Sequence, residues 1–143
     1  MEIKQQEIYS TFVFRFQKGE KIVESLKKYF KEHPIYKGAS ISAIGAVSYV
    51  KLGYFNGKKY EHKEYMEDLE IVNLTGNVSY NLEKEIIVHI HGIFGNNDYN
   101  CVGGHVFEAT VSATCEMQVT ILSPGLTRSL DDETGLQLLN LSK

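Results

Sequence analysis

The positions of hydrophobic and polar residues follow a helical period in one stretch of the chain, residues 20–31. There the apolar side chains recur with the spacing of one helix face, at Ile22, Val23, Leu26, Tyr29 and Phe30. Acidic residues early in the stretch and lysines late in it match the helix dipole. Pro34 prevents a longer helix, because proline lacks the backbone N–H that a helix interior needs. The pattern predicts one amphipathic helix over residues 20–31.

Outside this stretch the apolar residues alternate, or form short runs rich in β-branched and aromatic side chains, as in β-strands. Strands are predicted before the helix and after Lys37, at residues 8–16, 39–65, 69–80, 85–94, 105–113 and 115–122. Within 39–65, Gly45 predicts a bulge or bend, and Asn56-Gly57 predicts a hairpin turn.

The connections between the predicted strands are short. Short connections favour antiparallel pairing, because parallel strands need crossovers of a dozen or more residues. The leucines of the tail, residues 128–141, indicate that it packs back on the rest of the chain. We therefore expect an α+β fold, with a mostly antiparallel β-sheet packed against one principal helix, and a single domain over residues 1–143.

Composition and charge limit the function classes. The chain has 143 residues, 43% of them hydrophobic and 23% charged, which is typical of a globular protein. Its net charge of −3 lacks the basic surplus that nucleic-acid binders use to neutralise phosphates. Cys101 and Cys115 make no disulfide framework, and no apolar run has the length of a signal peptide core or a membrane span. The sequence predicts a cytoplasmic protein without membrane segments.

Three of the five histidines lie close together. Alternation along the predicted strand puts its aliphatic residues on the core face and His89 and His91 together on the other face, with Cα atoms roughly 7 Å apart. His105 follows Gly103-Gly104, which allow a sharp turn or a close approach between strands. The strand that His105 begins could lie opposite the pair. Three neutral imidazoles leave one position of a tetrahedral ion open, so the pattern predicts a zinc or other divalent metal site at His89, His91 and His105.

Several side chains have alternative roles. The three clustered histidines have an alternative role, because histidines on an outer sheet face can be satisfied by carboxylates or water without a metal. His33, at a helix end before proline, and His62, in the charged stretch EHKE, are not expected to bind metal. Cys101 lies between the histidine segments and is either a fourth ligand or a thiol without a role in the site. Glu70 and Glu116 are either surface carboxylates or partners that fix the imidazole tautomers.

The segment HIHGIFGNNDYNCVGGHVFEATVSATCEMQV resembles the signature of the plant and prokaryote conserved (PPC) domain. That signature is a His-x-His strand, then Gly-Gly-His, then a Thr-x-Glu-hydrophobic strand. The resemblance extends over almost the whole chain, through FRFQKGEKIVESL, ISAIGAVSYVKLGYF, LEIVNLTGNVS and RSLDDETGLQLL. It implies an α+β domain that assembles as a homotrimer. It also implies a zinc site at the matching histidines, His89, His91 and His105.

Plant members of this family pair the domain with AT-hooks, which insert an Arg-Gly-Arg-Pro core into the DNA minor groove, and stand-alone prokaryotic relatives often carry a DNA-binding label. This chain departs from that pattern. Arg15 and Arg128 are its only arginines, and neither lies in such a motif, so minor-groove insertion has no candidate residues. A trimer would still repeat Lys58, Lys59 and Lys63 around its axis.

Three functional hypotheses follow. The first is a trimeric metal-binding domain whose open coordination position binds a small ligand. The second is a zinc-dependent hydrolase or lyase in which Glu116 or Glu70 carries protons. The third is a DNA-binding or transcription-associated module. The chain has no nucleophile elbow and no phosphate-binding loop, so a nucleotide cofactor is not expected.

Overall fold

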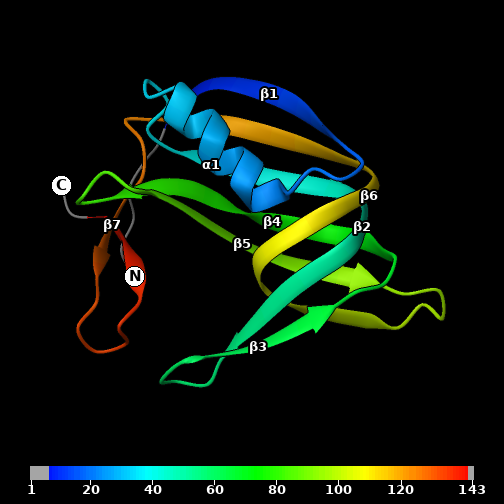
Figure 1. The fold of residues 1–143 in the computed structure, drawn as a ribbon. Helices are drawn as coiled ribbons and strands as arrows, with labels where there is room; N and C mark the ends of the chain where they lie inside the picture. Colours follow the sequence, from blue (N-terminus) through cyan, green and yellow to red (C-terminus); the bar gives the residue numbers. More distant parts are fainter. Residues whose placement is uncertain (1–6, 142–143) are drawn as a thin grey trace.

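The computed structural model describes residues 7–141, which contain one helix and eight strands. In chain order they are β1 (Glu7–Gln17), α1 (Ile22–Glu32), β2 (Ala39–Phe55), β3 (Tyr60–Tyr65), β4 (Leu69–Asn81), β5 (Ile86–Gly95), β6 (Cys101–Ser123), β7 (Thr127–Leu130) and β8 (Gln137–Asn140). Figure 1 shows α1 lying across the strands beside β1, with the β2–β3 hairpin at the opposite end. Within residues 7–141 no helix has the length and apolar character that a membrane span requires.

The strands form one mixed sheet in which every pair is antiparallel except β4 with β7. Four pairings form a closed circuit: β2 with β4, β4 with β5, β5 with β6, and β6 with β2. The α+β class and the mostly antiparallel sheet are thus confirmed. The circuit places β5 beside the start of β6, and these are the segments that carry the three clustered histidines.

β6 is a single strand of 23 residues, although the sequence predicted two separate strands there. No glycine or proline interrupts residues 105–122, so the strand bends through register shifts instead of breaking. The predicted bulge at Gly45 lies opposite this bend. Gly45 has a φ of 153°, and a Cβ at this position would lie 2.6 Å from the Cα of Cys115. The length of β6 lets it pair with β5 at one end and with β1 at the other.

The core is one cluster of buried apolar side chains from β1, α1 and strands β2, β4, β5 and β6. On β5 the alternation predicted from the sequence holds, because Val88 and Ile90 are buried while His89 and His91 lie on the other face. On β6 the same alternation buries Met117 and leaves Glu116 exposed.

Helix α1 buries its predicted stripe against β5 and β6 but begins at Ile22 instead of residue 20. Lys21 remains extended and forms a β-bridge with Thr110. Glu108 of β6 then caps the helix, accepting hydrogen bonds from the backbone N–H groups of Val23 at 2.8 Å and Glu24 at 3.0 Å. This carboxylate satisfies two amides of the first turn and complements the helix dipole.

The tail packs back as predicted: Leu136, Leu139 and Leu141 are partly buried, and contacts other than leucines also attach it. β7 pairs in parallel with β4, and β8 pairs with β7. Leu130 and Leu138 are 60% and 42% exposed, whereas Arg128 is 4% exposed. Backbone pairing and one buried guanidinium therefore also hold the C-terminal hairpin against the sheet.

Candidate metal centre

The antiparallel pairing of β5 with β6 brings the clustered histidines together. His91 lies directly opposite His105, and His89 lies two residues away on the same face of β5. Gly104 lies inside β6, not in a turn, and a Cβ at this position would come 2.8 Å from the carbonyl oxygen of Gly53 on β2. The absence of a side chain at Gly104 therefore allows β2 and β6 to pack closely beside His105.

The three imidazole rings converge on one region. Their centroids are 5.2 Å apart for His89 and His91, 5.2 Å for His89 and His105, and 5.5 Å for His91 and His105. One nitrogen of each ring lies within 4.8 Å of the others. The Nε2 atoms of His89 and His91 are 3.3 Å apart, and two nitrogens on one tetrahedral zinc ion would be about 3.4 Å apart. This pair already has the spacing of two ligands to one ion.

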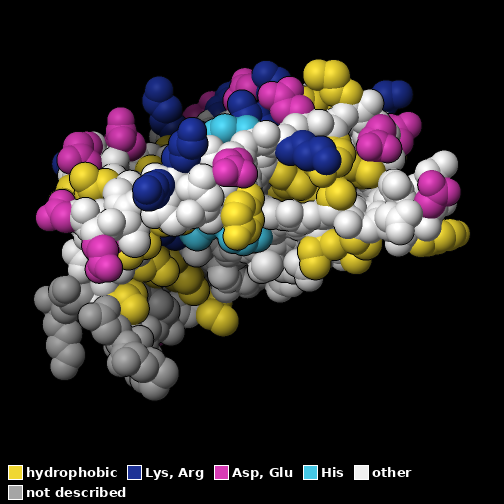
Figure 2. Space-filling view, turned by 90° about the horizontal axis from the view of Figure 1, so that it is seen from below, with side chains coloured by type: hydrophobic (Ala, Val, Ile, Leu, Met, Phe, Trp, Pro, Cys, Tyr) yellow, Lys and Arg dark blue, Asp and Glu magenta, His cyan; other side chains and the backbone are white. Residues whose placement is uncertain are grey.

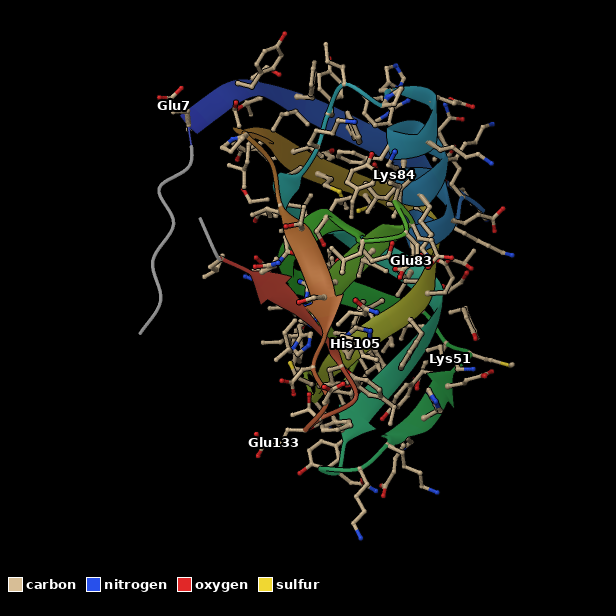
Figure 3. All side chains as sticks on the ribbon, turned by 90° about the vertical axis from the view of Figure 1, so that its left-hand side faces the viewer. Glu7, Lys51, Glu83, Lys84, His105 and Glu133 are labelled. Atoms are coloured by element: carbon tan, nitrogen blue, oxygen red, sulfur yellow. The ribbon has the colours of Figure 1, made fainter. Side chains whose placement is uncertain are left out.

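The triad lies on the face of the sheet opposite the core residues of β5. His91 is exposed and the other two rings are partly buried. Figure 2 shows histidine side chains reaching the surface, bordered by hydrophobic side chains. Figure 3 shows His105 within the sheet, in the region that the C-terminal hairpin covers. The arrangement is accessible to a small ligand from solvent.

Burial keeps two of the rings neutral. The pKa of His105 falls from 6.5 to about 4, first because burial disfavours the charged ring and then because His89, His91, Arg128 and His62 add positive charge nearby. Burial also lowers the pKa of His89, with smaller contributions from Arg128 and His91. A neutral imidazole has one unprotonated ring nitrogen, whose lone pair can bind a metal ion. The rings of His89 and His105 therefore need not change from the charged to the neutral form before a metal ion binds.

Arg128 of β7 is the main polar neighbour of the triad, and no pattern in the sequence predicted it as part of a site. Its Nη2 donates to Nδ1 of His89 at 3.1 Å and to Oδ1 of Asn77 at 2.8 Å. Its Nε donates to Oγ of Ser79 at 2.8 Å, and its Nη1 donates to the carbonyl oxygen of Gln137 at 2.6 Å. Four partners on three elements fix the guanidinium, which in turn orients the ring of His89.

The direction of these hydrogen bonds places the proton of His89. A guanidinium only donates, so Nδ1 of His89 accepts and the proton of the neutral ring lies on Nε2. That N–H points towards Nε2 of His91, at 3.3 Å. In this tautomer Nε2 of His89 has no free lone pair, so a cation can bind through that atom only after the proton has left it. If the proton moves to Nδ1, the hydrogen bond from Arg128 is lost.

Aromatic side chains form the wall beside His105. The ring of Phe107 lies 4.7 Å from it and the ring of Tyr60 lies 5.0 Å from it, both measured between centroids. His62 packs on Phe107 at 4.6 Å and is exposed, so it borders this wall outside the triad. His33 stacks on Tyr29 at 4.2 Å, and its Nδ1 lies 2.8 Å from the carbonyl oxygen of the same residue. Neither ring belongs to the group of three that could hold a metal among the described residues.

The predicted carboxylates and thiol lie apart from the triad. Glu116 is exposed, eleven positions along β6 from His105 and opposite Arg15 of β1. Glu70 is exposed and lies opposite Gly95, at the far end of β5 from His89. Cys101 is an exposed free thiol. Among residues 7–141, the group that could hold a metal consists of the three histidines without these side chains.

The donor set fits a zinc-type ion. Three neutral nitrogen ligands suit zinc, which accepts imidazole readily and keeps an open position when three protein ligands bind it. Within the described part of the chain, Nδ1 of His105 is buried without a hydrogen-bond partner. A buried ring nitrogen without a partner is costly in a protein that never binds anything there.

Comparison with known proteins agrees with this fold. The sequence profile of the Plants and Prokaryotes Conserved (PCC) domain matches residues 3–123, and the chain belongs to this family, whose name is also abbreviated PPC. No curated protein matches the sequence. The family match ends before Arg128, so the residue that orients His89 lies beyond the matched region.

Solved structures with the same fold include three that cover nearly the whole chain. A metal-containing protein from Archaeoglobus fulgidus is 37% identical, with a TM-score of 0.88 over 98% of this chain and 99% of that one. A plant- and prokaryote-conserved (PPC) protein from Pyrococcus horikoshii is 29% identical, with a TM-score of 0.89 over 100% of this chain and 99% of that one. A candidate DNA-binding protein from Bacteroides thetaiotaomicron is 28% identical, with a TM-score of 0.86 over 96% of each chain.

Proposed function

We propose that this protein binds one divalent metal ion, zinc, through His89, His91 and His105, and offers the open coordination position to a small anionic ligand. The observation that carries the proposal is the convergence of three imidazoles from two paired strands, each with a nitrogen within 4.8 Å of the others. The metal-containing relative from Archaeoglobus fulgidus, at 37% identity, supports it.

The charges around the triad favour an anion as the ligand. Neutral imidazoles leave the two charges of a zinc ion uncompensated, and the guanidinium of Arg128 adds a third. The side chains that lower the pKa of His105 are all histidine or arginine. A site with this surplus of positive charge attracts a carboxylate or a small oxyanion more strongly than a neutral or cationic molecule.

The same surroundings favour binding over hydrolase or lyase chemistry. Bound zinc would supply Lewis-acid polarisation of a ligand oxygen, but a hydrolase or lyase also needs a positioned proton carrier within hydrogen-bond reach. Glu70 and Glu116, the predicted carriers, lie elsewhere on the sheet. DNA binding through the minor groove is not favoured either, because Arg128 is buried and holds His89.

The assembly and compartment are part of the proposal. We infer a homotrimer of this single-domain chain from the family resemblance. A trimer would also cover some of the exposed hydrophobic side chains of β1, of which Val13 is 79% exposed. The free cysteines, one exposed and one buried, suit a reducing compartment such as the cytoplasm. Sedimentation equilibrium should give three times the chain mass of 16.2 kDa.

Metal analysis of protein purified without a histidine tag tests the site. We expect one zinc ion per chain, lost in the double variant His91→Ala/His105→Ala. The matched control is His33→Ala/His62→Ala, which removes the same number of imidazoles and leaves the triad intact, so it should keep the metal. Equal metal content in both double variants would refute the site. Binding to the open coordination position of the metal-loaded protein can then be measured by calorimetry, with acetate as the anionic probe and acetamide as its neutral counterpart. Acetate should bind more tightly than acetamide.

A further inference from the structure

A second candidate site lies on the other side of β7 from the triad. It is a cavity of about 560 Å³ between the end of α1, the turn that joins β4 to β5, and residues 124–127. Small-molecule pockets in proteins have volumes of this order, about 300–1,000 Å³. The cavity shares none of its lining residues with the histidine site.

The floor of the cavity is apolar. Phe30 of α1, Ile86 of β5 and Leu126 line it together with Pro34 and Pro124. Phe30 is buried and Ile86 and Leu126 are partly buried, so these side chains already face away from bulk water. A hydrocarbon or aromatic body in the cavity would remove the remaining apolar surface of Ile86 and Leu126 from solvent, which is favourable.

The rim of the cavity is positively charged. Lys31, Lys37 and Lys84 contribute ammonium groups, and no aspartate or glutamate is among the lining residues. The carboxylate of Glu85, which accepts a hydrogen bond from the lining residue Asn81 at 2.7 Å, offsets one of these three charges and leaves a positive surplus. Figure 3 shows Lys84 on its turn close to α1. Nζ of Lys37 lies 5.9 Å from the ring centroid of Tyr80, which keeps this charge over the aromatic wall.

Two carbonyl groups at the end of α1, those of Tyr29 and Phe30, already accept hydrogen bonds, the first from the backbone N–H of His33 at 3.0 Å. Tyr80 directs its hydroxyl to the carbonyl oxygens of Phe30 and Tyr36, at 3.2 Å each. Lys31 lies in the last turn, where a cation offsets the negative end of the helix dipole. The helix end therefore presents little net negative charge to an anion in the cavity.

We propose that this cavity binds a small amphipathic anion, with its apolar body on Phe30, Ile86 and Leu126 and its carboxylate or phosphate head among the three lysines. The lysines favour an anionic head group, and the apolar floor of the cavity favours a hydrocarbon or aromatic body. This proposal goes beyond the metal site and does not depend on it.

The test uses the full chain and three eight-carbon probes: octanoate, octyl phosphate and octylammonium. Binding is measured from the shifts of backbone amide resonances, including those of residues 125–127 at the cavity. We expect saturable shifts with octanoate, octyl phosphate or both, and the tighter of the two identifies the preferred head. Octylammonium should bind at least tenfold more weakly. Equal binding of all three probes, or no saturable shift at the cavity, would overturn the proposal.

A pair of matched variants tests the lysines. Lys37→Gln/Lys84→Gln removes two charges from the rim and should weaken binding of the preferred anion roughly tenfold, given that each partly exposed ion pair contributes modestly. Lys27→Gln/Lys28→Gln removes two exposed charges of α1 outside the cavity and should leave binding unchanged. Circular dichroism establishes that both variants fold. If the two variants bind the anion equally, the lysine rim is not the recognition element and the proposal fails.

Discussion

Acidification should destabilise the metal-free protein through His105. The folded-state pKa of this residue is about 4, against an ordinary value of 6.5. Between these two pH values the unfolded chain holds a proton on His105 and the folded chain does not. Unfolding therefore takes up a proton, and the free energy of unfolding must fall as the pH falls through this window.

The magnitude follows from the width of the window. Each pH unit is equivalent to about 1.4 kcal/mol, so a window that extends from 6.5 to about 4 corresponds to a loss of up to about 3 kcal/mol from this one ring. Above pH 6.5 the ring is neutral in both states and contributes no slope. Below pH 4 it is charged in both, and the loss is complete.

Urea unfolding of protein treated with a chelator measures this effect. The midpoints are compared across the window for the native sequence and for His105→Leu, which fills the same place beside Phe107 without a titrating group. We expect the two stability curves to be parallel above pH 6.5, and the native sequence to lose up to about 3 kcal/mol relative to His105→Leu as the pH falls from 6.5 to about 4, because only the native sequence has a buried ring there that resists protonation. Curves that stay parallel across the window would show that the buried ring has no depressed pKa, and the explanation given above for its neutrality would be wrong.

Three further substitutions test the structure, each by urea unfolding. Glu108→Ala removes the cap of α1 and should cost about 1–2 kcal/mol, whereas Glu116→Ala on the same strand should change stability by no more than about 0.5 kcal/mol; equal costs would mean that the cap contributes nothing. Gly104→Ala should cost about 1–3 kcal/mol, since its Cβ would meet the carbonyl oxygen of Gly53, and a neutral result would contradict the close approach. Arg128→Met leaves four hydrogen-bond partners unsatisfied and should cost at least about 2 kcal/mol, while an unchanged midpoint would show that the C-terminal hairpin is held by backbone pairing alone.

The histidine triad could be predicted because it depends on local rules. Strand alternation alone places His89 and His91 on one face, and the Gly-Gly-His segment comes next in the chain, where antiparallel pairing of neighbours is the default. The structure adds the register that sets His91 opposite His105. Helix α1 could be predicted from the sequence equally well, since its apolar stripe repeats over three turns.

The contribution of Arg128 could not be predicted in this way. It lies 39 residues from His89 in sequence and reaches it through a parallel pairing of β7 with β4. No periodic pattern specifies such a pairing, and the leucines of the tail pointed to an apolar attachment instead. The first residue of α1 could not be predicted for a similar reason. The side chain that caps the helix belongs to Glu108, which is 85 residues from Val23 in sequence. Contacts between distant elements decide such details, and amino-acid spacing does not record them.

Strand β7 joins two parts of the molecule that face opposite directions. Thr127 borders the lysine-rimmed cavity, and the next residue, Arg128, turns to the other face and holds His89. A shift of this short strand by an occupant of the cavity would move the guanidinium with it, and the imidazole would lose its orientation. The two candidate sites thus border adjacent residues of the same strand, and a displacement of β7 would reach both of them.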